Sequence, residues 1–148
     1  MPPDHGPGIL RSRELLDRLF DEIEANGFPA EKTVLFGFSQ GCLLTLEWGG
    51  RSQRELAGCV GISGYLYDSL ALGEEASEAA KKRPWLVTHG TQDEVLPYEV
   101  TAKQIADLQN AGLPIDFRTY AKTHTIDPDL PDIREAMLRM LGLERGCT

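Results

Sequence analysis

The segment best suited to chemistry is residues 37–41, in which Ser39 lies between Gly37 and Gly41. A Gly-x-Ser-x-Gly sequence between an apolar strand and a helix is typical of a nucleophile elbow, a sharp turn that holds a serine in a strained, exposed conformation. Both glycines are expected to be required, because strand and helix nearly touch there. The backbone N–H of Gln40, at the start of the helix, would face an oxyanion. The pattern favours a nucleophilic serine over a glycine-rich turn without chemistry.

A serine hydroxyl is a weak nucleophile until a base takes its proton, so a catalytic Ser39 requires a histidine and an acid elsewhere in the chain. Asp93 follows one apolar segment by four residues, and His124 follows a later segment by four residues. The chain order of serine, acid and histidine is that of α/β-hydrolases. Glu94 and Asp116 compete with Asp93 as the acid, and Glu94 is the fallback. We therefore expect Ser39, Asp93 and His124 to be the catalytic residues.

The other histidines and the cysteines carry weaker signals. His89 ends an apolar segment, which favours a buried, hydrogen-bonded structural role, and His5 has no evident role. The three cysteines are an odd number, and two of them lie in apolar segments, which favours free buried thiols over disulfides or a metal site. We expect no metal site and a reducing, cytoplasmic location. The cysteines are Cys42, Cys59 and Cys147.

Composition limits the classes of partner. A chain of 148 residues with 41% hydrophobic residues predicts one globular domain over residues 1–148, with residues 1–8 as a flexible tail. The formal charge of -8, with scattered basic residues, argues against nucleic acid and anionic membranes. No apolar stretch approaches the length of a membrane span.

The elements that must position the candidate residues follow from hydrophobic periodicity. Short apolar segments alternate with amphipathic ones, which predicts a parallel sheet with helices on both faces. Because ligands bind at the carboxyl ends of such strands, the loops that carry the candidate residues would meet there. The expected helices are 9–25, 42–48, 98–110 and 130–143, and the expected strands are 33–38, 57–64, 85–89 and 114–120. Residues 65–83 are expected to be a long loop with at most one helical turn.

Several of these blocks together resemble the phospholipase/carboxylesterase family, which includes acyl-protein thioesterases. The blocks are residues 37–41, 62–65, 89–97 and 124–126 within a resemblance that runs from about Ile9 to Leu141. The resemblance implies an α/β-hydrolase fold and hydrolysis of carboxylic esters or thioesters, with small or medium acyl groups, without a cofactor. It implies Ser39 as nucleophile, Asp93 as acid and His124 as base. Tyr65, Leu66, Leu96 and Pro97 would line an acyl pocket.

The sequence also departs from the family pattern. Thr123 precedes the histidine where family members more often carry glycine, and no segment before Ile9 matches the family's first strands or its oxyanion loop. We therefore expect a short, truncated α/β-hydrolase sheet of about four strands. With the N–H of Gln40 as the single oxyanion donor, kcat is expected to be lower than that of an enzyme with two such donors by a factor on the order of 10²–10³.

Two classes of function follow, an active serine esterase and an impaired hydrolase fold that serves for binding or assembly. The strand from Thr33 to Phe38 would have one unpaired side and carries no proline or inward charge to block pairing with another chain. We therefore expect a homodimer that joins two copies through this strand.

Overall fold

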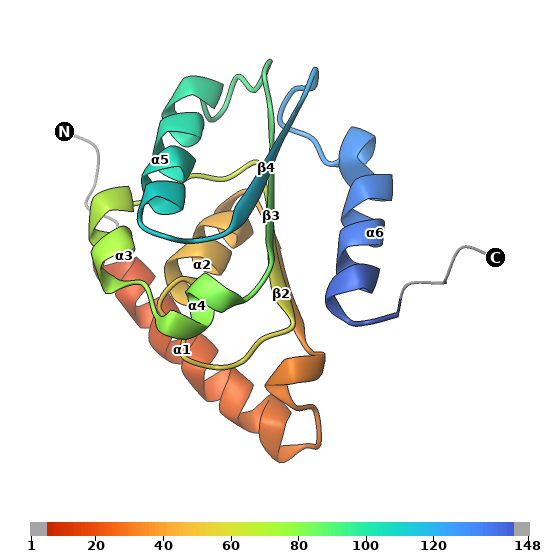
Figure 1. Cartoon of the computed structure of the whole chain (residues 1–148). Helices are drawn as coiled ribbons and strands as arrows, with labels where there is room; N and C mark the ends of the chain where they lie inside the picture. Colours follow the sequence, from red (N-terminus) through yellow and green to blue (C-terminus); the bar gives the residue numbers. More distant parts are fainter. Residues whose placement is uncertain (1–5, 144–148) are drawn as a thin grey trace.

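The computed structural model describes residues 6–143 and contains four parallel strands in the order β1-β2-β3-β4 (Figure 1). The strands are β1 (Val34–Phe38), β2 (Gly58–Ile62), β3 (Trp85–Gly90) and β4 (Ile115–Tyr120). The α-helices are α1 (Gly6–Ala25), α2 (Gln40–Gly49), α3 (Ser69–Glu75), α4 (Glu78–Lys82), α5 (Tyr98–Asn110) and α6 (Leu130–Met140), and two 3₁₀ turns are η1 (Ala30–Lys32) and η2 (Asp127–Asp129).

The sheet is continuous and in regular parallel register. Phe38, the last residue of β1, is paired with Ile62 of β2, and Ile62 with Thr88 of β3. Each strand runs in the same direction, so the segments that follow all four strands leave from one edge of the sheet. The predicted α/β fold with a short parallel sheet is confirmed.

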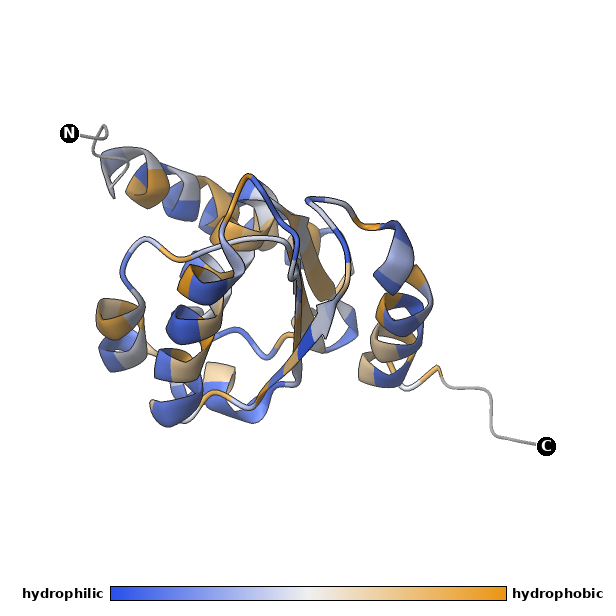
Figure 2. Ribbon diagram, turned by 90° about the horizontal axis from the view of Figure 1, so that it is seen from above, coloured by the Kyte–Doolittle hydropathy of each residue, from blue (hydrophilic) through white to orange (hydrophobic). Residues whose placement is uncertain are grey.

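Helices cover both faces of the sheet, but unequally. Each strand is added on the same side of the previous one, and right-handed connections between such strands place all their helices on one face of the sheet. Helices α2, α3, α4 and α5 lie on that face, together with α1. Only α6, which follows the last strand, lies on the other face of the described structure (Figure 2). The prediction of helices on both faces is therefore confirmed.

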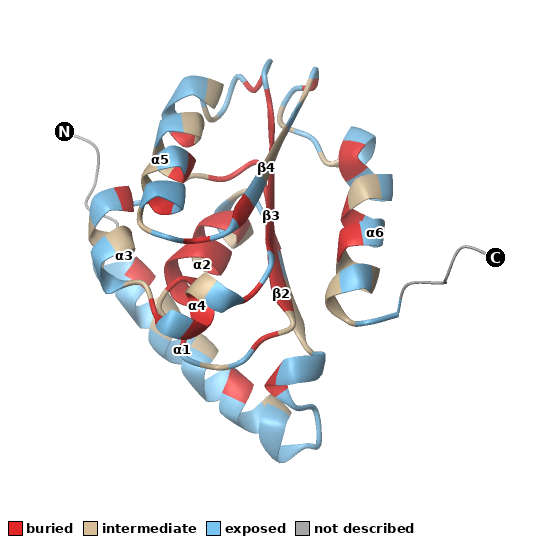
Figure 3. Cartoon of the chain, in the orientation of Figure 1, coloured by how far each residue is buried: buried red, intermediate tan, exposed pale blue. Residues whose placement is uncertain are grey.

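The core consists of two apolar clusters, one on each face. The larger cluster includes Leu46 of α2, Trp85 of β3 and Ile105 of α5, and the smaller includes Val60 of β2 and Ile133 of α6. Every residue of β2 and β3 is buried, as expected for central strands of a parallel sheet (Figure 3). These two buried strands support the loops at the carboxyl edge of the sheet.

Four expectations about local structure need correction. The segment 65–83 is not one long loop, because Asp68 and Ser77 cap the short helices α3 and α4 by accepting the N–H groups of Ala71 and Ala80. Residues 6–8 belong to α1, and the rest of the expected tail lies outside the described residues. The last helix ends at Met140 instead of Leu143. In the expected amphipathic helix 9–25, now part of α1, the apolar side is only partly covered, since Leu15 and Leu19 are exposed.

None of the helices within residues 6–143 has the length and apolar character needed to cross a lipid bilayer.

Candidate functional site

Ser39 occupies a strained turn between β1 and α2. Its backbone has φ 57° and ψ -115°, in the left-handed range of φ that residues with a side chain rarely adopt. The turn is fixed on both sides, because the Ser39 N–H donates to the Ile62 carbonyl at 2.8 Å and the Ser39 carbonyl accepts the N–H of Leu43 at 3.1 Å. Gln40 opens α2, so its N–H is one of the first helical N–H groups, which have no acceptor within the helix.

The two glycines around Ser39 do not play the same part. A Cβ atom on Gly37 would lie 2.1 Å from the Gly41 carbonyl oxygen and 2.6 Å from Oγ1 of Thr45, so strand and helix do touch at this position. A Cβ atom on Gly41 would meet nothing within 4 Å. The expectation that Gly41 must be small for steric reasons is therefore wrong in this structure, and only Gly37 is required for the close approach.

The structure brings the three predicted side chains into one chain of contacts. Nε2 of His124 lies 3.0 Å from Oγ of Ser39, and Nδ1 of the same ring lies 2.7 Å from Oδ2 of Asp93. Asp93 comes from the loop after β3, His124 from the loop after β4, and Ser39 from the turn after β1. The ring of Phe38 lies beside the imidazole, with centroids 5.1 Å apart. Glu94, the alternative acid, is exposed next to this arrangement.

Asp93 is held as an ionised hydrogen-bond acceptor. Its Oδ1 atom accepts the backbone N–H groups of Val95 and Leu96 at 2.9 and 2.8 Å, which leaves Oδ2 for His124. Burial is the largest single influence and acts to raise the pKa of Asp93, but the hydrogen bonds from Leu96, His124 and Val95 together outweigh it. The pKa therefore lies below the usual value for an aspartate.

These contacts fix the tautomer of His124. An ionised carboxylate can only accept hydrogen bonds, so Nδ1 of His124 must carry the proton that it donates to Asp93. In the neutral ring Nε2 is then free of hydrogen and can accept the hydroxyl proton of Ser39. The arrangement is suited to removing a proton from Ser39.

His89 lies close to this arrangement but is fully buried. Its Nε2 atom is 2.8 Å from the Leu96 carbonyl oxygen and 3.5 Å from Oδ2 of Asp93. This is the buried, hydrogen-bonded position that the sequence predicted for His89. Cys42 and Cys59 are buried and free, as predicted, and burial raises the pKa of their thiols to about 12 and about 11.

The residues predicted to line an acyl pocket differ in how far they are exposed to solvent. Leu66 is only 2% exposed and packs in the larger core cluster, so it offers no surface to a substrate. Tyr65 and Leu96 are half-buried and Pro97 is exposed, and these lie on the loops after β2 and β3. Phe38, which sequence reasoning did not select, is 37% exposed. The signal that could have identified Phe38 as a substrate contact is its position immediately before Ser39 in the sequence.

Sequence reasoning also missed a buried polar group beneath the His124 loop. Nζ of Lys122 lies 2.6 Å from Oδ2 of Asp129, and Oγ1 of Thr88 donates to the same oxygen at 2.5 Å. Lys122 and Asp129 read as ordinary loop charges, and nothing in their spacing signals that they are buried.

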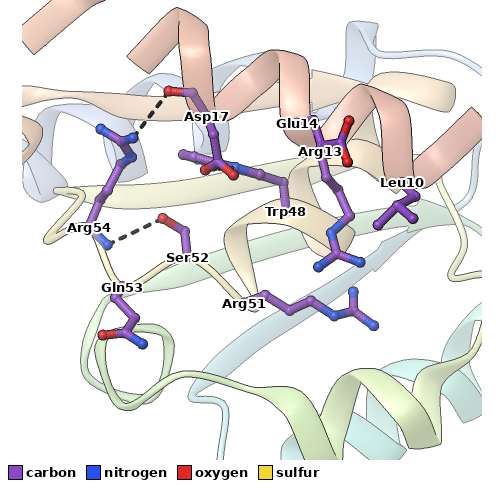
Figure 4. A pocket seen from close by; sticks show the side chains of 9 residues that line it. All are labelled: Leu10, Arg13, Glu14, Asp17, Trp48, Arg51, Ser52, Gln53 and Arg54. Atoms are coloured by element: carbon purple, nitrogen blue, oxygen red, sulfur yellow. Dashed lines mark hydrogen bonds between the residues drawn. The ribbon is translucent and has the colours of Figure 1, made fainter. Parts of the chain in front are cut away.

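A separate cavity of about 510 Å³ lies between α1 and the carboxyl end of α2, away from Ser39 at the start of that helix (Figure 4). Arg51 and Arg54 line it, but their guanidinium groups are already paired with carboxylates. Because these charges are compensated, we assign no ligand to this cavity. Within residues 6–143, no three His, Cys, Asp or Glu side chains gather as a metal site would require.

A short parallel sheet with a strained serine between strand and helix defines a protein of the α/β-hydrolase class. The sequence profile of the phospholipase/carboxylesterase family matches residues 4–137. The chain belongs to this family.

Relatives with curated names agree with this assignment. Acyl-protein thioesterase 1 of Emericella nidulans is 31% identical over 144 residues, a match that covers 94% of this chain and 60% of the relative. A probable carboxylesterase of Oryza sativa is 34% identical over 118 residues, covering 80% of this chain and 44% of the relative. The chain thus spans about 60% or less of the length of these relatives.

Solved structures share the fold. Arabidopsis thaliana SOBER1 superposes with a TM-score of 0.86 at 28% identity, over 95% of this chain and 67% of that protein. Esterase PE8 superposes with a TM-score of 0.80 at 27% identity, with the same coverage of both chains.

Proposed function

We propose that this protein is a serine hydrolase that cleaves small carboxylic esters or thioesters through a covalent acyl-enzyme. The observation that carries the proposal is the unbroken contact path from Oγ of Ser39 through His124 to Asp93, with distances of 3.0 and 2.7 Å. Membership of the phospholipase/carboxylesterase family, and relatives named as thioesterase and carboxylesterase, support the same chemistry.

In the first half of the reaction, Oγ of Ser39 bonds to the carbonyl carbon of the ester while Nε2 of His124 takes the hydroxyl proton. The carbonyl oxygen becomes an oxyanion, and the N–H of Gln40 at the start of α2 donates to it. When the tetrahedral intermediate collapses, the bond to the leaving group breaks. His124 gives its proton to the departing alcohol or thiol, and Ser39 remains acylated.

In the second half, water attacks the acyl carbon and His124 takes a proton from that water. Collapse releases the carboxylic acid, and the proton on His124 returns to Oγ of Ser39. Asp93 stays ionised throughout and holds the proton on Nδ1, so that Nε2 faces the serine in both halves. The substrate would lie against the half-exposed ring of Phe38 and the loop residues Tyr65, Leu96 and Pro97.

The test is hydrolysis of p-nitrophenyl esters of graded acyl length by the unmodified protein and by Ser39→Ala and His124→Ala. Both substitutions are expected to reduce the rate to background for every ester, because each removes one partner of the proton transfer. Glu94→Gln is the matched control, since Glu94 neighbours the acid but is exposed. Ester hydrolysis that survives Ser39→Ala would refute the proposal.

A second proposal rests on the open edge of the sheet. Among the described residues, β1 is paired on one side only, with β2, and Phe36 is exposed on it. An apolar groove of about 450 Å³ runs beside it, lined by Phe36, Leu130, Ile133, Arg134, Met137, Leu138 and Leu141. We propose that two copies pair antiparallel through residues 33–38 about a two-fold axis. Light scattering that finds a monomer at micromolar concentration would refute the dimer.

We also propose a reducing, cytoplasmic location, which the free buried thiols of Cys42 and Cys59 support. A role as a binding or assembly module without catalysis is the alternative to the esterase, and it predicts no reaction of Ser39 with a mechanism-based probe.

A further inference from the structure

The loop that carries His124 is anchored by a buried ion pair. Nζ of Lys122 lies 2.6 Å from Oδ2 of Asp129, and the two side chains are 1% and 0% exposed. It is the only pair of a lysine or arginine with a carboxylate, within residues 6–143, in which both side chains are almost completely buried. Burying two charges removes their hydration, and the attraction between them often only offsets that cost. A gain in the free energy of folding therefore does not by itself explain why the chain buries this ion pair.

The pair makes contacts that bracket the histidine. Nζ of Lys122 also donates to the carbonyl of Thr125 at 2.7 Å, so one ammonium group holds residues on either side of His124. Asp129 in turn accepts the hydroxyl of Thr88, from the buried strand β3, at 2.5 Å. The ammonium and the carboxylate thus tie the loop after β4 to the rigid centre of the sheet.

The same loop is joined to the loop of the acid. The backbone carbonyl of Lys122 accepts the N–H of Gln92, the residue before Asp93, at 3.0 Å. Apart from the η2 turn, residues 121–129 form no helix or strand, so few backbone hydrogen bonds hold this loop. The placement of the His124 ring between Ser39 and Asp93 therefore depends on side-chain contacts of the loop.

We propose that Lys122 and Asp129 act as a positioning pair, which holds the His124 imidazole in line with both Ser39 and Asp93. Neither residue touches the reacting atoms, so the pair acts only through His124. This inference rests on the proposed function for its effect on rate, because a displacement of about 1 Å in a catalytic group can cost on the order of 10²-fold in rate. Its effect on the geometry of His124 does not depend on that function.

The pair is best tested by removing both charges together. Lys122→Met alone would leave the Asp129 carboxylate buried without its cation, and its Oδ1 atom has no hydrogen-bond partner in the described part of the chain, so this variant is expected to unfold readily. Lys122→Met/Asp129→Asn removes both charges and keeps an oxygen that can accept the Thr88 hydroxyl. We expect this double variant to melt within a few degrees of the unmodified protein.

Two measurements are made on the double variant. For hydrolysis of a p-nitrophenyl ester, we expect kcat to fall by about 10- to 100-fold with KM changed by less than about threefold, because misplacement of the base slows proton transfer and leaves binding intact. By proton NMR, we expect the downfield Nδ1–H resonance of His124, assigned by its loss in His124→Ala, to weaken or disappear.

The matched control is Arg51→Met/Glu47→Gln, which removes another largely buried ion pair, between Glu47 of α2 and Arg51 just after that helix, at the end of α2 opposite to Ser39. It should leave both kcat and the His124 resonance unchanged. If the Lys122/Asp129 variant keeps the kcat and the resonance of the unmodified protein, or if the control loses them equally, the positioning role is overturned. If the unmodified protein shows no hydrolysis that depends on Ser39 but the resonance still responds to the double variant alone, the proposed function fails and the positioning role stands.

Discussion

Replacing Gly37 by alanine is predicted to destabilise the protein far more than the same change at Gly41, although both glycines belong to one Gly-x-Ser-x-Gly sequence. The new Cβ atom at position 37 would lie 2.1 Å from a backbone oxygen and 2.2 Å from a backbone carbon of Gly41, so β1 and α2 must separate by about 1 Å. Backbone cannot rotate away as a flexible side chain can. The cost is therefore expected at the upper end of the range for overpacking, about 3 kcal/mol.

A loss of this size corresponds to a fall in Tm of roughly 6–12 °C for a chain of this length. At position 41 the new methyl group meets nothing within 4 Å, and alanine has a higher helix propensity than glycine. Gly41→Ala should therefore be neutral or stabilising by up to about 1 kcal/mol. The assay is thermal and urea unfolding of both variants beside the unmodified protein. Equal stability of Gly37→Ala and Gly41→Ala would refute the account of how strand and helix approach each other.

Four further predictions follow from the site and the sheet edge. Asp93→Asn should retain a small fraction of the ester hydrolysis rate, whereas Glu94→Gln should retain nearly all of it. Equal loss of rate in both variants would show that the acid is misassigned. Hydrogen bonds lower the pKa of Asp93 in the folded protein, so the unfolded chain takes up this proton at a higher pH than the folded chain does. The resulting contribution to stability is complete above about pH 4 and is lost as pH falls through the pKa of the folded protein. Below pH 4, Tm should therefore fall more steeply with pH in the unmodified protein than in Asp93→Asn. Because burial raises the pKa of the Cys42 and Cys59 thiols, these two should react with a thiol reagent at pH 8 only after unfolding, and rapid modification of either one in the folded protein, located by peptide mass spectrometry, would contradict their burial. Phe36→Pro removes a backbone donor from the unpaired side of β1 and should give monomer or aggregate by light scattering, whereas an unchanged dimer would exclude this strand from the interface.

The regular parts of the fold could be predicted from the sequence because their signals are local. The apolar runs at β2 and β3 mark central strands, and the expected helix 98–110 has the observed bounds of α5. The two short helices between β2 and β3 were missed because α4 spans only five residues, too few for a helical period to show. Their capping residues, Asp68 and Ser77, were the available signal.

The arrangement of the candidate site could be anticipated for the residues whose place in the topology is fixed. Ser39, Asp93 and His124 each follow a parallel strand, and parallel strands end at one edge, so their proximity follows from chain order. The contacts of Lys122 with Asp129 could not be predicted, because a loop charge becomes buried only through the three-dimensional course of the loop. The burial of Leu66 depends in the same way on tertiary packing, since its backbone is held by the side chain of Gln104.

Activation of Ser39 by His124 can be measured by reaction with a fluorophosphonate probe, which needs an activated hydroxyl but no complete turnover. We expect the unmodified protein to be labelled at Ser39. Labelling should vanish in Ser39→Ala and fall to background in His124→Ala. An unmodified, folded protein that is not labelled, or labelling that persists at full rate in His124→Ala, would show that His124 does not activate Ser39.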